Sequence, residues 1–557
     1  MEPAVAVADP VGTEPSGATR WLGFAGLAAG LALIVLDGTV VSVALPSIID
    51  DLGLGLADAQ WVNSLYAVVF AALLLTSGRL GDRFGRRLLF VLGVSVFAMA
   101  SLTAAGAQDA GELIVSRCVQ GIGGAMILPA TVSSLNANFR GRDRSLAFGL
   151  WGAVIAAAAA VGPLLGGWLT TAFSWRWVFL VNLPLALVVV GLAAGFLPET
   201  RGEAARGVDV GGLLTSGTGL GLLVFGLIEG HDLGWWSPRN DFTLFGLVRP
   251  ETATVSPVPF ALGAGAVLTA AFLLLERRRL SRGRAVILDL SLFRLPTFAW
   301  GNLTAAMVAV GEFALLFGLP LYLVYAMRLT ILRAGWVLAA MALGAFFAGA
   351  RARSLASRLG PPRVVTLGLA IELGAAVAAA AVLPSQPSAW VIAGLLAVYG
   401  LGLGLASAQL TSTVLGDVPV GVSGVASATQ STVRQLGSAL GAALAGTVLA
   451  IGFAVTVPAR LSLVAGVSAD DANTMIDYMT GTAGAVISMI RKKGTHGYFG
   501  HLGPAVADQL SVAFAQCVSA VLWVAAAFIL LGLVGALAVE RVSRASAEPA
   551  GVAPVEA

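Results

Sequence analysis

Apolar stretches long enough to cross a bilayer recur along the whole of this chain. A helix of about 20 residues spans the hydrocarbon core of a membrane, and inside lipid only helices and closed barrels satisfy every backbone hydrogen bond. We expect fourteen such helices, at residues 22–45, 59–78, 88–106, 112–136, 146–170, 175–196, 210–230, 258–276, 297–325, 334–350, 363–383, 389–414, 424–451 and 511–538. The sequence therefore predicts an all-α polytopic membrane protein with 14 transmembrane helices.

The composition supports lipid as the solvent for most of the chain. Hydrophobic residues make up 57% of it and charged residues only 11%, whereas soluble domains carry about 25% charged residues. The formal net charge of +3 comes from scattered basic residues, so no nucleic acid partner is expected. The two cysteines, Cys118 and Cys517, lie in apolar runs, and we expect unreactive thiols, no metal and no cofactor.

The chain carries no signature of an enzyme or of an ATP-driven pump. It lacks a glycine-rich phosphate-binding loop ending in Lys-Ser or Lys-Thr, and no histidine or cysteine is grouped with a nucleophile. The three histidines, His231, His496 and His501, all fall in predicted loops. None is placed to carry protons at mid-membrane, so an ion gradient that acts through carboxylates is the expected energy source.

Basic residues predict the orientation. Of the 33 Lys and Arg residues, 22 fall in segments on the N-terminal side of the predicted membrane and nine on the other side. Four of those nine lie in one long loop, where charge has little influence on topology. The positive-inside rule therefore predicts a multi-pass protein of the cytoplasmic (inner) membrane with both termini in the cytoplasm.

We expect two bundles joined by a linker. The segments are a disordered cytoplasmic tail (1–20), an N-terminal six-helix bundle (21–197), two linker transmembrane helices with an outer loop at 231–257 (198–295), a C-terminal six-helix bundle with a long outer loop at 452–510 (296–540), and a cytoplasmic tail (541–557). Loops as long as these two are usually functional or disordered. We expect a monomer.

A short internal echo relates the two bundles. Residues 80–85 read LGDRFG and residues 355–360 read LASRLG, and both precede an odd-numbered helix on the cytoplasmic side. The repeat is therefore parallel, an arrangement that transporters use. Ser357 stands where the first copy has Asp82, so a second cytoplasmic contact should be weaker than the first.

The most distinctive segment is residues 78–87, GRLGDRFGRR, called here the motif loop. Its glycines suit a tight turn between two helices, and an aspartate among arginines can form charge-assisted hydrogen bonds. Such a loop can hold one conformation shut, although a plain basic cytoplasmic loop is the alternative. The residues expected to form this conformational clasp are Gly78, Asp82, Arg83, Gly85, Arg86 and Arg87.

These ten residues resemble the cytoplasmic signature loop of the major facilitator superfamily. Three further stretches are similar to motifs of its fourteen-helix drug:proton antiporter family: residues 36–46 (LDGTVVSVALP, with Ser42 where asparagine is usual), 117–124 (RCVQGIGG) and 162–167 (GPLLGG). The resemblance covers about residues 21 to 540. It implies two six-helix bundles with two inserted helices, and export in exchange for protons.

Two charged residues stand inside predicted helices of the first bundle. Asp37 lies within the first apolar run, where an unpaired carboxylate costs about 2.5–3.5 kcal/mol and is suited to bind and release protons. The resemblance implies the same role, and a position near the outer interface is the alternative. Arg117 shares a helix face with Gln120 and could couple a nearby carboxylate to helix movement, or simply extend to the interface.

The remaining proposed site residues are polar or small positions within helices. Gly162, Pro163, Gly166 and Gly167 allow another helix to pack closely, and the resemblance adds a role in antiport. Glu312, in the ninth helix, is expected to bind a proton or a cationic substrate; Glu372, in the eleventh, is expected to be peripheral. The substrate cavity is predicted to be lined by Asn63, Tyr66, Gln120, Trp151, Asn302, Tyr322, Gln409, Gln430 and Arg434.

The function expected from these features is multidrug efflux. We expect a proton-coupled exporter of lipophilic small molecules, cations among them, that works by alternating access and confers antibiotic resistance. The alternative is lipid transport: export of a lipid or lipid-linked metabolite by the same fold. An importer, or a facilitator without protons, is disfavoured by the Gly-Pro stretch of the fifth helix.

Overall fold

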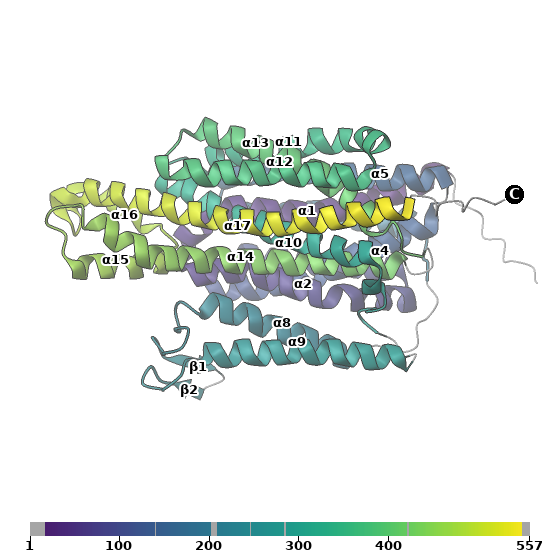
Figure 1. Ribbon diagram of the computed structural model, residues 1–557, viewed down its shortest axis with the longest axis horizontal. Coiled ribbons are helices and arrows are strands. Elements are labelled where there is room, and N and C mark those ends of the chain that lie inside the picture. The colour runs from purple at the N-terminus through teal and green to yellow at the C-terminus, as the bar shows by residue number, and fades with distance from the viewer. Residues whose placement is uncertain are drawn as a thin grey trace, which may run out of the picture.

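The computed structural model describes residues 17–139, 141–201, 209–244, 247–282, 284, 286–419 and 423–547. Most of the two predicted tails, 1–16 and 548–557, lies outside these residues, as does 202–208 of the predicted linker. The described helices run roughly along one common axis (Figure 1). This arrangement is the one expected when each helix crosses the same membrane.

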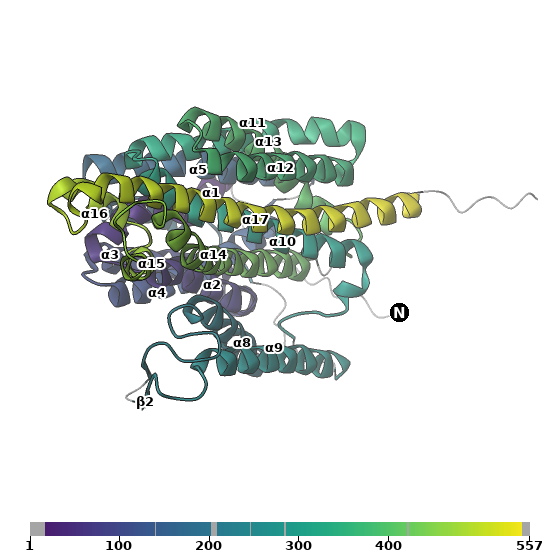
Figure 2. The same cartoon turned by 60° about the vertical axis from the view of Figure 1, so that its left-hand side comes forward.

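The first bundle follows the predicted order of helices. It consists of α1 (Gly17–Leu52), α2 (Leu56–Phe84), α3 (Arg86–Gly106), α4 (Ala110–Asn138), α5 (Gly141–Ala172), and the short α6 (Trp177–Leu180) followed by α7 (Asn182–Phe196). Two inserted helices, α8 (Val210–Glu229) and α9 (Pro257–Ser281), form a hairpin beside α2 (Figures 1 and 2). Between them β1 (Phe242–Leu244) pairs antiparallel with β2 (Leu247–Arg249).

The second bundle follows a short connecting 3-10 turn, η1 (Leu292–Arg294). It consists of α10 (Pro296–Leu321) continued by a π-helical turn η2 (Tyr322–Ala326), α11 (Ile331–Leu359), α12 (Pro361–Val382) with η3 (Leu383–Ser385), α13 (Ala389–Val414), α14 (Ser423–Leu461), and α17 (Gly503–Ala547). Between α14 and α17 lie α15 (Ala469–Gly481), α16 (Val486–Lys493), η5 (Gly494–His496) and η6 (Gly500–Leu502).

Twelve of the fourteen predicted spans fall within observed helix; 175–196 begins two residues before α6 and is interrupted at Val181, and 210–230 extends one residue past α8. Thirteen helices in the described part of the chain are long and apolar enough to cross a membrane. The remaining predicted span, 146–170, lies in α5, a helix of 32 residues whose recognised apolar part, Ala157–Ala172, is shorter. The predicted outer loop 452–510 begins too early and ends too late, because α14 continues to Leu461 and α17 begins at Gly503.

The bundle has two distinct ends. We call the end that carries the motif loop the motif end, and the end that carries residues 230–256 and 462–502 the loop end. At the motif end Gly85 joins α2 to α3 with a φ of 128°, and Gly360 joins α11 to α12 with a φ of 87°. Residues that carry a side chain rarely adopt these backbone angles. The two copies of the short sequence repeat, residues 80–85 and 355–360, therefore form the same kind of glycine turn at the same end.

The two bundles meet towards the loop end. Tyr325 donates a hydrogen bond to the carbonyl of Pro46 (2.8 Å) and to Asp50 (3.1 Å). Gln60 donates to the carbonyl of Ala443 (2.6 Å), and Ser64 donates to that of Ala439 (3.2 Å). Among the described residues these are the recorded hydrogen bonds between the bundles, and none involves the part of α2 next to the motif loop.

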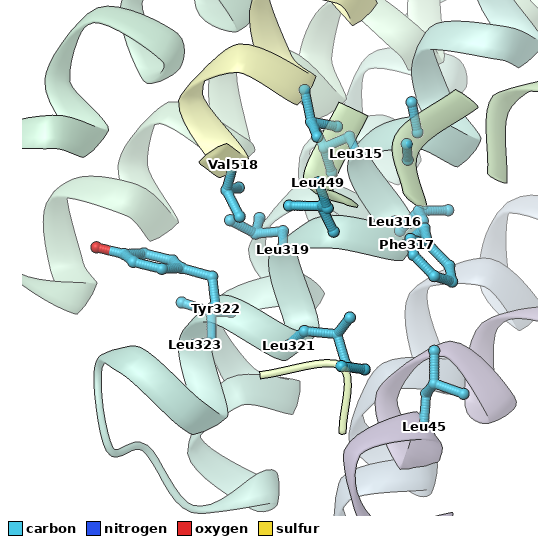
Figure 3. Close-up of a cluster of buried hydrophobic side chains, with 14 of the residues drawn as sticks. Leu45, Leu315, Leu316, Phe317, Leu319, Leu321, Tyr322, Leu323, Leu449 and Val518 are labelled. Atoms are coloured by element: carbon cyan, nitrogen blue, oxygen red, sulfur yellow. The ribbon is translucent and has the colours of Figure 1, made fainter. Parts of the chain in front are cut away.

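An apolar cluster closes the same end. Leu45 of α1 belongs to one buried cluster with Leu316, Phe317 and Leu321 of α10, and Figure 3 shows these side chains near one another. Since α1 and α10 both run from the motif end to the loop end, the cluster covers their last turns. The conformation is therefore closed at the loop end.

Candidate functional site

The most deeply buried ion pair joins α1 to α4. The Nη1 of Arg117 lies 2.5 Å from Oδ2 of Asp37, and the two side chains are 1% and 0% exposed. The expectation of an unpaired carboxylate at position 37 is therefore wrong. Because α4 packs against α1, the guanidinium of Arg117 lies at the same depth in the bundle as the carboxylate of Asp37. Their pairing offsets the free-energy cost of burying each charge.

Three amide and hydroxyl side chains complete the shell around this pair. Gln120 accepts a hydrogen bond from Arg117 (2.8 Å) and donates to Oδ1 of Asp37 (3.2 Å). Asn182 of α7 also donates to Oδ1 of Asp37 (3.2 Å). Ser101 of α3 accepts from both amides, at 2.8 Å and 3.2 Å. These five residues, which we call the α1–α4 site, surround the carboxylate with matched hydrogen-bond donors and one positive charge.

Asn182 and Ser101 were not among the residues expected from the sequence. Asn182 is the one polar residue of α7, and Ser101 is one of several polar residues in the mainly apolar α3; polarity within an apolar helix was the available signal. That signal does not say which helices meet. Their role follows from the packing of α1, α3, α4 and the start of α7 around one point.

The arginine is fixed from its other side as well. Its Nε donates to the carbonyl of Val62 (3.2 Å), and its guanidinium lies 4.3 Å from the centre of the Tyr66 ring. The Tyr66 hydroxyl is buried and has no hydrogen-bond partner among the described residues. Tyr66 and Gln120, both predicted to line the substrate cavity, therefore belong to the interior of the first bundle in this conformation.

A second ion pair joins α10 to α14 in the other bundle. Arg434 Nη2 lies 3.5 Å from Glu312 Oε2, and the side chains are 50% and 13% exposed. Gly437 and Gly441 bring α14 close to α10, because a Cβ on either would lie within 2.5 Å of a carbonyl oxygen of α10. This close approach places Arg434 beside Glu312, a pairing that the sequence did not indicate.

The other predicted cavity residues are distributed over several environments. Asn63, Trp151 and Gln409 are partly exposed, whereas Gln430 and Asn302 are buried. Asn302 donates to the carbonyl of Phe298 in its own helix (2.8 Å). Tyr322 is buried near the loop end beside a cavity of about 410 Å³, and Figure 3 shows its hydroxyl pointing away from the apolar cluster.

The hydrogen bonds of the motif loop are made within the first bundle and with the segment that follows α7. Asp82 accepts two hydrogen bonds from Arg86 (2.9 and 2.8 Å), and Arg86 also donates to the carbonyl of Ser133 in α4 (3.2 Å). Glu199, which follows α7, accepts from the backbone nitrogens of Arg87 and Leu88 (3.0 and 3.1 Å). The acid at the positive N-terminus of α3 is therefore Glu199, and Asp82 instead pairs with Arg86.

The glycines of α5 bring three helices into contact. A Cβ on Gly162 would lie 1.8 Å from the hydroxyl of Thr39, and one on Gly166 would lie 2.8 Å from the carbonyl of Val40. Gly167 faces α11, where a Cβ on Gly335 would lie 2.6 Å from the carbonyl of Pro163. The helix that carries Asp37 is thus packed on α5, and α5 is packed on the second bundle.

His231 lies just after α8, whereas His496 lies in η5 and His501 lies in η6. Burial is the main cause that lowers the pKa of His231 and raises the pKa of Asp232 beside it. Burial thus favours the neutral form of each. No group of three or more metal-ligating side chains occurs within the described residues.

Comparison with known proteins identifies the architecture. A family model described as the Major Facilitator Superfamily matches residues 27–442. The chain is 34% identical to the puromycin resistance protein pur8 of Streptomyces alboniger, over 77% of this chain and 82% of that protein. It is 32% identical to the methyl viologen resistance protein SmvA of Salmonella typhimurium, over 76% and 81%.

Two further comparisons agree. The chain is 32% identical to a probable actinorhodin transporter of Streptomyces coelicolor, over 78% of this chain and 73% of that protein. Its fold is similar to that of a bacterial homolog of the human lysosomal transporter Spinster, solved in an inward-facing and occupied conformation. The TM-score is 0.61 at 15% identity, with 94% of this chain and 98% of the other covered.

Proposed function

The chain belongs to the major facilitator superfamily, whose members are transporters and not enzymes, and we propose that it exports lipophilic small molecules in exchange for protons. It is a multi-pass membrane protein related to antibiotic and drug resistance exporters. Proton exchange, the direction of transport and the substrate class are parts of our proposal.

We place the motif end in the cytoplasm. The support is the excess of arginine in the segments at that end together with the positive-inside rule. In this orientation the closed loop end faces outward. A compound would then enter between the bundles from the cytoplasmic leaflet or the cytosol, and the bundles would rock to release it outside.

The α1–α4 site is the observation that carries proton coupling. Its carboxylate is fully buried and balanced by one arginine, so adding a proton to Asp37 would leave Arg117 charged and unpaired in a dry interior. A buried pair that loses one partner costs about 3–5 kcal/mol. A proton can therefore bind only when the helices rearrange and give Arg117 another partner or water. That requirement links protonation to movement.

The packing of α1 supplies a route from the site to the other bundle. Thr39 and Val40, which follow Asp37 closely, contact Gly162 and Gly166 of α5, and α5 in turn touches Gly335 of α11. A change at Asp37 that shifts α1 therefore bears directly on the contact between the bundles. Small shifts are transmitted because such close contacts leave no free space.

Glu312 and Arg434 support a substrate that carries positive charge. Their pair is partly exposed and long, at 3.5 Å, so it contributes little to stability and is open to exchange. A lipophilic cation could replace Arg434 at the carboxylate. A neutral compound would leave the pair intact and bind through apolar contacts alone.

The proposal is tested by efflux from proteoliposomes with an imposed pH gradient. A lipophilic cationic dye is loaded, and Asp37→Asn is compared with the wild type and with Asp51→Asn, a control in the same helix whose carboxylate is about half exposed and binds Arg176 at the loop end. We expect Asp37→Asn to lose pH-driven efflux and Asp51→Asn to keep it. Undiminished pH-driven efflux by Asp37→Asn would remove this residue as the proton site.

A further inference from the structure

The hairpin of inserted helices, α8 and α9, holds two buried acids at its motif end. Asp209 is the N-cap residue of α8, and its side chain is 0% exposed. Glu276 lies in the last turns of α9 and is also 0% exposed. Acids are almost never fully buried unless they are paired, and neither belongs to the site in the first bundle. Their role therefore needs a separate account.

One oxygen of each carboxyl group has a backbone donor. Asp209 Oδ1 accepts from the backbone nitrogen of Gly212 (2.8 Å), and Glu276 Oε2 accepts from that of Leu288 (2.8 Å). The two remaining oxygens converge above Gly212. A Cβ on that glycine would lie 2.7 Å from Asp209 Oδ2 and 2.6 Å from Glu276 Oε1, so only glycine leaves room for both.

These two converging oxygens are buried and receive no hydrogen bond within the described residues. Arg279 Nε lies 3.0 Å from Asp209 Oδ2 as an ion pair, outside hydrogen-bond geometry. Two ionised carboxylates at such a position repel each other. One proton shared between them makes one group the donor and the other the acceptor, as in other buried carboxyl pairs.

Within the described residues, two positive charges act on these acids. Arg279 of α9 supplies one, and Arg79 of α2, which interacts electrostatically with both acids, has its Nη1 buried without a hydrogen-bond partner there. Helix α8 has no charged residue before Glu229, and α14 has none before Arg434. With one shared proton the pair carries a single negative charge, which Arg279 balances; without it, a second negative charge faces Arg79.

We propose that Asp209 and Glu276 bind one shared proton, and that loss of this proton draws Arg79 onto the pair. The proton leaves to water at the motif end, and no bond other than its own is broken. Arg79 is the second residue of the motif loop, so its movement ties the inserted hairpin to the α2–α3 turn. The inserted helices thereby make the conformation of the α2–α3 turn depend on the pH at the motif end.

Infrared spectroscopy of the reconstituted full-length protein tests proton binding directly. We expect the wild type to show an absorption band of a protonated carboxyl group that disappears as the pH rises. Glu276→Gln and Asp209→Asn should each abolish this band, and both keep a group able to hydrogen-bond in place. Glu540→Gln, at a largely buried acid of α17 at the same end, is the control and should keep the band.

Movement is tested by a spin-label distance between α3 and α9. Labels at Leu88→Cys and Ser281→Cys, both exposed positions, are placed in a chain with Cys118→Ser and Cys517→Ser. We expect the distance to shorten as the pH rises in the wild type and to stay unchanged in Glu276→Gln. Melting temperatures of all variants show whether they remain folded.

Three results would overturn the proposal: no pH-dependent carboxyl band in the wild type, a band that survives both substitutions, or a distance whose pH dependence survives Glu276→Gln. Neither readout needs a substrate or a proton gradient. Failure here therefore leaves the export proposal standing, and a failed efflux assay leaves this one standing.

Discussion

Among the described residues, each bundle holds one acid–arginine pair with both members inside the predicted spans, and the two pairs differ in almost everything else. In the first bundle Asp37 and Arg117 are 0% and 1% exposed and 2.5 Å apart, and the amides of Gln120 and Asn182 bind them. In the second, Glu312 and Arg434 are 13% and 50% exposed and 3.5 Å apart. The comparison teaches that the same two kinds of charge can take different roles when their side chains are buried and when they are exposed.

The physical reason is the dielectric environment. Charges in a dry interior interact strongly and cannot be separated cheaply, so the first pair can couple to a movement of whole helices. Charges in contact with water are screened and exchange partners easily. The second pair is therefore suited to bind a substrate reversibly. The following predictions separate these two roles.

The largest effect is expected for Arg117→Met. It leaves Asp37 buried with its partner removed, which should lower the free energy of unfolding by about 3–5 kcal/mol. Thermal unfolding of the purified protein in detergent measures this loss. The double variant Asp37→Asn with Arg117→Met should recover most of the stability and still lack pH-driven efflux. If the double variant is as unstable as Arg117→Met alone, the pair is not the source of the loss.

A smaller effect is expected for Asn182→Ala. It removes the amide that donates to Asp37 and Ser101, and a hydrogen bond to a charged group contributes about 1.5–3 kcal/mol. Thermal unfolding should show a loss in that range, and the pH profile of efflux should move. Asn302→Ala is a matched control, because that amide binds only the carbonyl of Phe298 among recorded partners. Equal pH profiles for the two variants would contradict the role of Asn182.

The smallest effect is expected for Glu312→Gln. The exposed pair contributes at most about 1 kcal/mol after screening, so the stability should hardly change. Affinity for a lipophilic cation should fall about fivefold, since about 1.4 kcal/mol corresponds to tenfold, and affinity for a neutral lipophile should not fall. Efflux of the two classes at several concentrations measures the difference. Equal losses for both would show that the carboxylate does not select for charge.

Several parts of the site could be found from the sequence because the membrane makes them conspicuous. Asp37, Arg117 and Glu312 are charges inside long apolar runs, and lipid tolerates few of these. The motif loop could be identified from the sequence because its glycines predict a turn between two helices and its arginines predict a loop outside the lipid. Asn182, Ser101 and Glu199 were not found, since one polar residue in a helix or after it does not reveal which helix it meets.

The sequence by itself determined the helices, their number to within the one uncertain apolar stretch of α5, and the doubling of the bundle. It could do so because every span must satisfy its own backbone in lipid, and that requirement is local. Only the tertiary structure decided that Asp37 is paired, that Arg434 meets Glu312, and that the loop end is the closed one. Those facts depend on which helices pack against each other and at what depth. The paired residues are 80 or more positions apart, so no local sequence pattern predicts their contact.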